Sequence, residues 1–301
     1  MWFKNLRIYQ VTDQLQLDAD RLEQALAEHK FTPCLSQDAL KIGFTSPLHP
    51  SLKGFFYQVD QLYVFAVRRQ EKVLPAAAIE EEMQPKIAAA EQEKGRPLSR
   101  KEKQALKEET TLALLPRAFS RSVVTQAIYD ADSNYLLVNT SSATRAEELL
   151  ALLRKALGSL PAVPWLDGNL LSQSMQQWLA GQDLPVGMQL GHEAELKAPD
   201  EEGAKVRFSN HLLTTEDVQS HLEDKLVTRL QLQIPEQLSF LICEDGSLKK
   251  LQFEELLAGK NEELGWDDVA QRLEADLLVM NHELQQIIET LRQQVKPAIK
   301  S

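Results

Sequence analysis

The sequence predicts an α+β protein in which antiparallel sheets are flanked by helices and carry a helical arm. Strand, hairpin and helix patterns alternate irregularly, without the regular strand–helix alternation of a parallel sheet. Tight-turn signals join neighbouring strands, as at Asp245-Gly246, which is typical of antiparallel hairpins. Two helical stretches follow one another between residues 74 and 115, and these predict the arm.

The first seventy residues predict mostly strands. Alternating apolar residues indicate strands, and a helical apolar stripe indicates one helix. The hairpin in this region should turn near Asp60. The expected elements are a strand at 2–12, a helix at 15–30, a loop at 31–37, a strand at 39–44 and a hairpin at 54–69.

Helices make up the next stretch. Pro75 suits the first turn of a helix that runs to residue 95, and Pro85 should kink or split that helix. A capping box of Ser99 and Glu102 starts a second helix, which runs to residue 115. These two helices are expected to form the arm.

The turn after the arm looks superficially like a calcium loop. Asp130, Asp132 and Asn134 give the D-x-D-x-N start of such a loop. Tyr135 occupies the glycine position, however, and Ser141 occupies the position of the bidentate glutamate. The stretch therefore predicts a plain hairpin turn.

The rest of the chain mixes strands and helices. Periodicity does not decide whether Leu277–Met280 is a buried strand or helix. The apolar helical stripe beyond Asn281 suits either the core or a dimer seam. The expected elements are strands at 121–130 and 134–139, a helix at 143–157, a proline-rich connector at 159–165, a helix at 169–180, an acidic loop-rich stretch at 187–203, a strand at 205–213, a helix capped by Thr214, strands at 225–233, 238–244 and 248–253, and a helix opening near Asp267.

Composition shifts suggest four regions. The sheets of the N- and C-terminal parts can be shared across their boundaries. The regions are an N-terminal α+β region at 1–74, the helical arm at 75–118, a hairpin–helix region at 119–166 and a C-terminal α+β domain at 167–301.

The overall charge is acidic, with 33 basic and 44 acidic residues and a net charge of −11. Such a chain does not coat nucleic acid over its whole surface, so any nucleic-acid binding must use a segregated face. Cys34 and Cys243 lie far apart without a CxxC motif, which favours a reducing compartment. The N-terminus lacks a signal-peptide pattern, and no apolar run approaches the ~18 residues of a membrane span. A cytoplasmic protein is expected.

Residues 94–121 form a basic island in this acidic chain. The island holds eight Lys or Arg residues against three Glu residues, a local charge of +5. At about 100° per residue, Arg100, Lys103 and Lys107 share one helix face, and the row spans about 10 Å. Such a row can follow the phosphates of a nucleic-acid strand, or it can be an ordinary solvated helix face.

The end of the island, LLPRAFSR at 114–121, has a different character. Pro116 ends the helix, and Arg117 and Arg121 then flank Phe119. An aromatic ring between two arginines can stack on nucleic acid, anchor a subunit contact or simply belong to the core.

No catalytic motif is present. The sequence lacks a P-loop, a G-x-S-x-G motif and a G-x-G-x-x-G motif. HEAEL at 192–196 begins like a zinc-protease helix, but Leu196 stands where the second histidine is needed, and HELQQ at 282–286 fails in the same way. His211 and His221 fit no metal-site spacing. The sequence therefore predicts a protein that is not an enzyme.

Several segments together resemble one bacterial family, that of the recombination-associated protein RdgC. The resemblance covers essentially the whole chain, and the segments occur in the family's order and spacing. They are WFKNL (2–6), FTPCLSQ (31–37), EKVLP (71–75), LLPRAFSR (114–121), ALLRKALGSLPAVP (151–164), EAELK (193–197) and EDGSLKKLQF (244–253).

The resemblance implies a DNA-binding function without cofactor or metal. Members of this family bind double-stranded DNA with little sequence preference and single-stranded DNA more weakly. They form a ring-shaped homodimer, and duplex DNA is thought to pass through its positively lined hole. They negatively modulate the RecA recombinase and associate with the nucleoid in the cytoplasm.

The residues expected to contact DNA are basic, and Phe119 is expected at the dimer interface because the family has that motif. Two rival functions remain: an acidic protein-interaction module that inhibits the recombinase by direct contact, and a nuclease, which no motif supports. The expected phosphate contacts are Arg96, Arg100, Lys103, Lys107, Arg117 and Arg121, then Arg68, Arg69, Lys249 and Lys250, with Arg207, Asn210 and His211 as weaker candidates.

Overall fold

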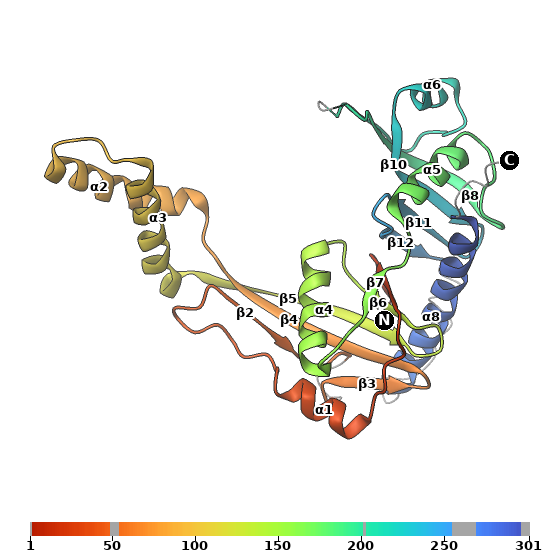
Figure 1. The fold of residues 1–301 in the computed structure, drawn as a ribbon, viewed down its shortest axis with the longest axis horizontal. Coiled ribbons are helices and arrows are strands. Elements are labelled where there is room, and N and C mark those ends of the chain that lie inside the picture. Colours follow the sequence, from red (N-terminus) through yellow and green to blue (C-terminus); the bar gives the residue numbers. More distant parts are fainter. Residues whose placement is uncertain (1, 49–53, 201–202, 255–268, 296–301) are drawn as a thin grey trace. The chain divides into compact units, whose positions relative to one another are not determined.

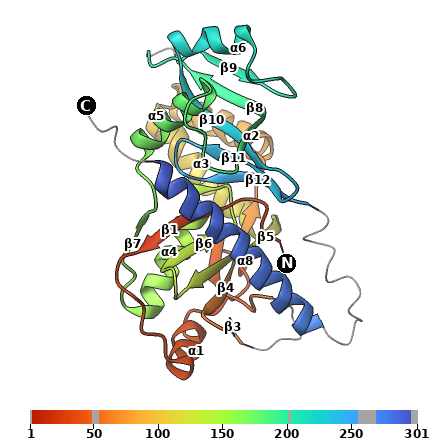
Figure 2. The same ribbon diagram turned by 90° about the vertical axis from the view of Figure 1, so that its right-hand side faces the viewer.

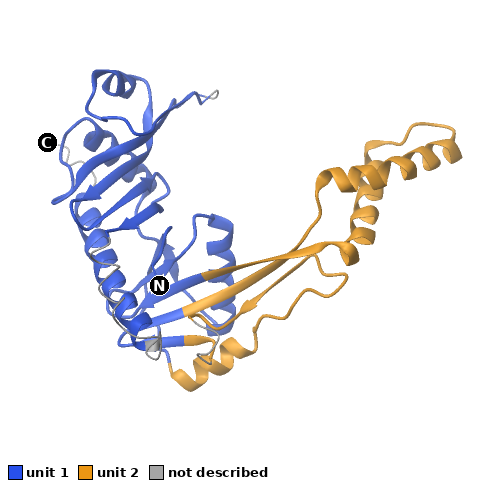
Figure 3. Ribbon diagram, turned by 180° about the vertical axis from the view of Figure 1, so that it is seen from behind, with its two compact units in different colours: residues 1–17, 57–64, 126–301 blue, residues 18–56, 65–125 orange. Residues whose placement is uncertain are grey.

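The computed structural model describes residues 2–48, 54–200, 203–254 and 269–295. Within these ranges the chain forms two antiparallel sheets with flanking helices, which confirms the predicted α+β class (Figure 1). Contacts divide the chain into two compact units (Figure 3): unit 1 holds residues 1–17, 57–64 and 126–301, and unit 2 holds residues 18–56 and 65–125. The four regions expected from composition stay a prediction.

The larger sheet has seven strands in the order β2-β4-β5-β6-β1-β7, with β3 paired to β4. Strands β4 and β5 are each 12 residues long, and both have residues in the two units. The bounds are β1 Arg7–Val11, β2 Leu40–Phe44, β3 Phe56–Val59, β4 Leu62–Val73, β5 Phe119–Asp130, β6 Tyr135–Val138 and β7 Ala162–Pro164.

The turns of this sheet agree with the sequence. Asp60 adopts a positive φ of 51° between β3 and β4, as the predicted hairpin requires. The carboxylate of Asp130 accepts the backbone N–H groups of Asp132 and Ser133 between β5 and β6, so this stretch is the predicted turn. The short strand β7 lies in the proline-rich stretch that was expected to be only a connector.

Helix α8 (Val269–Gln294) supplies much of the core of unit 1. Leu277 and Met280 are buried helical residues, which answers the question that periodicity left open. Figure 2 shows α8 running beside the larger sheet, and the guanidinium of Arg292 donates a hydrogen bond to the Tyr135 hydroxyl of β6 at 3.2 Å. The expected helix start near Asp267 lies outside the described residues. The stripe is core, with Leu284, Ile287, Ile288, Leu291 and Val295 all buried.

The second sheet, in unit 1, has five strands in the order β12-β11-β10-β8-β9. The stretch 187–203, which was expected to be rich in loop, instead contains strand β8 over Gln189–Lys197. Its side chains alternate between buried and outward positions from Ala194 onward. The other bounds are β9 Lys205–Phe208, β10 Leu226–Ile234, β11 Leu238–Cys243, β12 Leu248–Phe253, α4 Ala143–Leu157, α5 Gly168–Leu179, α6 Glu216–Ser220 and η2 His221–Glu223.

The segment after β9 departs from the expected strand at 205–213. The chain leaves the sheet after Phe208, and Asn210 adopts a left-handed φ of 52°, which a continuing strand does not accommodate. The cap of α6 is Thr215 rather than Thr214.

Backbone pairing in unit 1 joins the N-terminal segment to β12. The N–H of Leu6 donates to the carbonyl of Leu248 at 2.7 Å, and the reverse bond measures 2.9 Å. The guanidinium of Arg7 binds the Asp245 carboxylate at 2.7 Å. Gly246 has a φ of 74°, which confirms the tight turn predicted at Asp245-Gly246.

Unit 2 contains α1 (Ala19–Ala27), the helical arm and the adjoining parts of β4 and β5 (Figure 3). The arm consists of α2 (Ala76–Lys94), α3 (Arg100–Leu114) and the short helix η1 (Leu115–Arg117). Pro85 does not split α2. Both Pro85 and Glu81, whose carbonyl loses its helical partner, are exposed, so water can satisfy that carbonyl.

The two cysteines are free thiols, Cys34 half-buried and Cys243 buried. In the described part of the chain, no helix combines the length and the apolar character needed to cross a membrane.

Candidate nucleic-acid interface

A capping box starts helix α3, which carries the basic row of Arg100, Lys103 and Lys107. The Ser99 hydroxyl accepts the Glu102 N–H at 3.3 Å, and the Glu102 carboxylate accepts the Ser99 N–H at 2.8 Å. These bonds satisfy free donors at the helix start, and they fix the register of the following residues. Arg100, Lys103 and Lys107 are all exposed on this helix. The structure thus presents the predicted row to solvent.

Glu102 neutralises another part of the basic island. Its carboxylate accepts two hydrogen bonds from the Arg96 guanidinium, both at 3.0 Å, and one from the Lys94 amine at 2.6 Å. The bonds from Arg96 and then Lys94 hold the pKa of Glu102 well below its usual range. Lys103 approaches Glu91 at only 4.0 Å, a looser pairing. Arg96, an expected phosphate contact, therefore already has an anionic partner within the arm.

The residues where the arm leads into strand β5 are strongly exposed. Arg117 and Arg121 are both exposed, and Phe119 between them is 87% exposed. Phe119 is the first residue of β5, and its exposure shows that the side chain does not enter the core. The possibility that Phe119 belongs to the core is wrong, which leaves a contact with nucleic acid or with another protein chain.

A largely apolar groove in unit 2 has Phe119 in its lining. Its volume is about 660 Å³. Exposed aromatic side chains next to apolar grooves are typical of contact surfaces between proteins. Its apolar lining includes Val73, Leu74, Pro75, Pro85, Leu114 and Phe119, and the charged residues Glu81, Glu82 and Arg117 line it as well.

Arg68 and Arg69 on β4 are held by neighbours in unit 2. The Arg68 guanidinium lies 5.3 Å from the centre of the Phe31 ring, a cation–π contact. Arg69 forms an ion pair with Glu71. Both arginines are partly buried. They are less available to a phosphate than the α3 row.

A second group of candidates lies on the five-stranded sheet of unit 1. Lys250 binds the carboxylate of Glu193 at 2.6 and 2.7 Å, and Arg207 lies 3.7 Å from the same carboxylate. Lys249, one residue earlier, points into a pocket instead. Of these two neighbouring lysines of β12, Lys250 is already paired with a carboxylate, whereas Lys249 lines a pocket that a ligand can enter.

The weaker candidates Asn210 and His211 lie in the turn after β9. The His211 Nε2 atom is 3.5 Å from the Asp217 carboxylate, and the His211 ring is 5.5 Å from the Phe208 ring. Hydrogen bonding by Thr215, more than the charge of His211, lowers the pKa of Asp217. These contacts are local to the turn.

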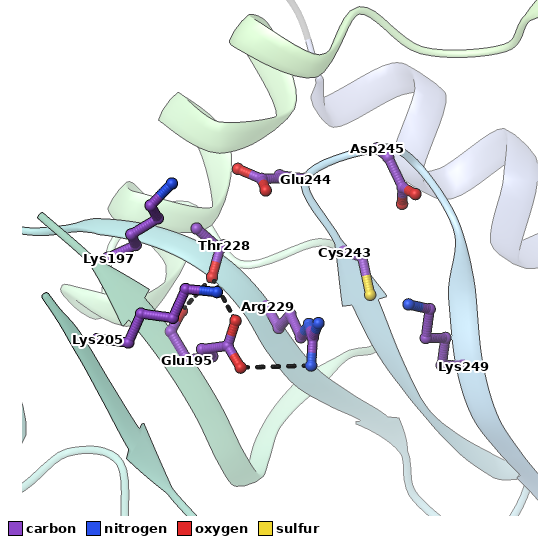
Figure 4. Close-up of a pocket in the computed structure, with 9 residues that line it drawn as sticks. All are labelled: Glu195, Lys197, Lys205, Thr228, Arg229, Cys243, Glu244, Asp245 and Lys249. Carbon is purple, nitrogen blue, oxygen red and sulfur yellow. Dashed lines mark hydrogen bonds and ion pairs between the residues drawn. The ribbon is translucent and has the colours of Figure 1, made fainter. Parts of the chain in front are cut away.

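The pocket beside Lys249 was not predicted from the sequence. Figure 4 shows Lys197 and Lys205 on one side of it, Arg229 in the middle and Lys249 on the other side. The only signal in the sequence was the alternation of Glu195 and Lys197 in the EAELK segment, since the other members come from separate strands.

No group of His, Cys, Asp and Glu side chains that could hold a metal ion occurs among the described residues. The HEAEL segment lies on strand β8 rather than on a helix.

Comparisons with known proteins agree on one family. The family described as "Putative exonuclease, RdgC" matches residues 1–297 of this chain. A protein of Proteus mirabilis (strain HI4320) named Recombination-associated protein RdgC is 40% identical over 290 residues, which cover 96% of each chain. A protein of the same name from Yersinia enterocolitica is 40% identical over 292 residues, 97% of this chain and 96% of the relative.

Proposed function

Because this chain belongs to the RdgC family, we propose that it is a DNA-binding protein that acts in recombination. In this proposal it binds double-stranded DNA without sequence preference and single-stranded DNA more weakly. It works as a homodimeric ring around the duplex in the cytoplasm, at the nucleoid, and it restrains RecA. The names of the relatives support the link to recombination.

The observation that carries the proposal is the exposed basic row on α3. Arg100 and Lys107 have no ion-pair partner within the described part of the chain, and Lys103 has only the 4.0 Å approach to Glu91. Lys and Arg contacts to phosphate position a protein on DNA without reading its bases. A row of about 10 Å on a rigid helix suits two or three successive phosphates.

A ring explains how a chain of net charge −11 binds a polyanion. Acidic residues would face solvent, while the basic residues of two copies would gather on an inner surface. The groove and the 87% exposed Phe119 support one of the contacts between copies. In a two-fold symmetric contact, the Phe119 of each copy can enter the groove of the other.

The proposal is tested by comparing a linear duplex with the same duplex blocked at both ends by bulky groups. Complexes are formed at low salt and then challenged with high salt, which removes proteins held only by phosphate contacts. We expect retention on the blocked duplex and loss from the free-ended one. Equal loss from both would refute encirclement, and failure to bind either duplex would refute DNA binding.

A second candidate function is an acidic interaction module that inhibits the recombinase by direct contact. The consecutive, exposed Glu80, Glu81 and Glu82 on α2 favour it, because such a surface suits a basic partner. This candidate predicts that RecA inhibition persists at salt concentrations where the protein no longer binds DNA. Parallel loss of both activities would favour DNA binding.

The family description contains the word exonuclease, whereas the names of the relatives do not. We propose a binding role rather than DNA cleavage. Incubation with end-labelled duplex and Mg²⁺ or Mn²⁺ should leave the DNA intact. Metal-dependent shortening that copurifies with the protein would make it an enzyme.

A further inference from the structure

Basic side chains from four strands converge on one face of the five-stranded sheet. Strand pairing places Lys205 of β9 opposite Lys197 of β8, and Arg229 of β10 opposite Cys243 of β11. Directly paired residues of antiparallel strands point to the same side of a sheet. Lys249 of β12 completes the cluster, with its amine turned toward Cys243 and Arg229 (Figure 4).

The largely buried carboxylate of Glu195 forms an ion pair with Arg229 in this pocket. Glu195 Oε2 lies 3.3 Å from Arg229 Nη1, and Glu195 Oε1 accepts the Thr228 hydroxyl at 3.2 Å. The Glu195 side chain is only 13% exposed, whereas that of Arg229 is 37% exposed. The Thr228 hydroxyl also lies 3.1 Å from the Glu195 backbone carbonyl, so it shares its one hydrogen between the carbonyl and the carboxylate. Arg229 is the charged partner of the carboxylate, and its guanidinium has further N–H groups that can bind a ligand.

The remaining charges leave the pocket positive. Asp245 is paired with Arg7 at 2.7 Å, and Arg229 is balanced by Glu195. The three pocket lysines have no ion-pair partner among the described residues, and they face one remaining carboxylate, that of the exposed Glu244. Two net positive charges therefore remain without a partner in the described part of the chain.

The floor of the pocket is small and neutral. It includes the Thr228 side chain and the Cys243 thiol, whose pKa is raised by burial, so that the thiol carries no charge at neutral pH. The volume is about 160 Å³, the space of about five water molecules. That space accommodates one phosphate group.

We propose that this pocket binds one phosphate group. Several charged donors from rigid strands around a small concavity are the arrangement that recognises phosphate oxygens. Three sources can supply this phosphate group: the monoester at the end of a DNA strand, a phosphodiester within the strand, and free phosphate. This inference deepens the proposed function. The assignment of the phosphate to DNA rests on that function, whereas the binding of free phosphate does not.

The first test uses inorganic phosphate and the full chain. Calorimetric titration at constant ionic strength, with chloride as the reference anion, should show saturable phosphate binding. In the double variant Lys205→Gln, Lys249→Gln, the dissociation constant should rise at least tenfold. The matched control Arg154→Gln, Lys155→Gln removes two exposed charges from the end of α4 and should bind normally. Equal binding by the variant and the wild type, or no saturable binding, would overturn the proposal.

A second measurement needs no variant. Acetylation of the wild-type lysines is followed by mass spectrometry with and without phosphate. Phosphate should slow the modification of Lys197, Lys205 and Lys249 several-fold, and it should leave Lys155 unchanged. Unaltered rates at all three pocket lysines would contradict the site even if the double variant fails to fold.

The experiment that tests DNA as the source of the phosphate compares duplexes with 5′-phosphate and 5′-hydroxyl ends. A several-fold preference for the phosphorylated ends that disappears in the Lys205→Gln, Lys249→Gln variant assigns the pocket to a terminal monoester. Equal weakening of both duplexes by the variant assigns it to the strand backbone. Phosphate binding by a protein that binds neither duplex leaves the pocket standing and refutes only the DNA-binding function.

Discussion

The side-chain amide of Asn281 on α8 donates a hydrogen bond of 3.0 Å to the buried carboxylate of Asp130 at the end of β5. Gln285 donates to the same oxygen at 2.9 Å, while the other oxygen accepts two backbone N–H groups of the turn. One carboxylate therefore fixes both a hairpin turn and the helix that covers it within unit 1.

Replacing this carboxylate should destabilise unit 1. Asp130→Ala leaves the buried amide donor of Asn281 without an acceptor, and it also removes charge-assisted bonds, at a cost of about 3 kcal/mol in the free energy of unfolding. Urea denaturation measures the change. The control Asp132→Ala alters an exposed side chain of the same turn and should stay within about 0.5 kcal/mol. Similar stability of the two variants would contradict the role of Asp130.

The basic row on α3 should set the salt dependence of DNA binding. Replacing Arg100 and Lys107 by Gln removes two cations without anionic partners, so the slope of log K against log salt should fall by about 1.8 in magnitude. Affinity should drop equally on unrelated sequences. Arg154→Gln with Lys155→Gln serves as the control of equal charge. A slope that stays at the wild-type value would move the DNA contacts away from α3.

The exposed Phe119 should stabilise the dimer. Phe119→Ser removes an aromatic anchor, and anchors of this kind contribute about 2 kcal/mol or more, so the dimer dissociation constant should rise at least tenfold. Sedimentation equilibrium gives the constant. Leu112→Ser, at a residue that is 56% exposed on α3, is the control. An unchanged dimer with weakened DNA binding would make Phe119 a DNA contact.

The capping box on α3 should depend on pH through Glu102. Since Arg96 and Lys94 lower the pKa of this carboxyl, its stabilisation is present above the ordinary value of about 4.3 and is lost as the pH falls toward the lowered value. Hydrogen exchange at residues 99–104 should be faster in Glu102→Gln than in the wild type at pH 7, and the difference should shrink at pH 3. A difference in exchange rate between variant and wild type that does not change with pH would show that the charge of Glu102 does not stabilise the capping box.

Local chemistry made much of the fold predictable. Ser99 with Glu102, Asp245 with Gly246, and the stripe that includes Leu284 and Leu291 each act through near neighbours, and the structure contains all three features. Strand β8 was missed because glycines and acidic residues surround it, although Ala194 and later residues alternate as a strand does.

The candidate site was less predictable for a physical reason. The exposure of the α3 row follows from helical spacing, but the pairing of Arg96 with Glu102 depends on how the chain turns at Gly95. The pocket needs the register of separate strands, which brings Lys197 and Lys249 together across 52 positions of sequence. No local pattern encodes that register.

The pairing of Glu102 with Arg96 and Lys94 gives the arm a counterion of its own. In water most Lys and Arg side chains exchange small ions freely, and DNA binding releases ions from the phosphates that those cations neutralise. A cation already held by a carboxylate of the same chain neutralises no phosphate unless that carboxylate is displaced. The number of ions released should therefore follow the unpaired cations of the arm, so a count of all eight Lys and Arg residues of the basic island overstates how strongly salt opposes binding.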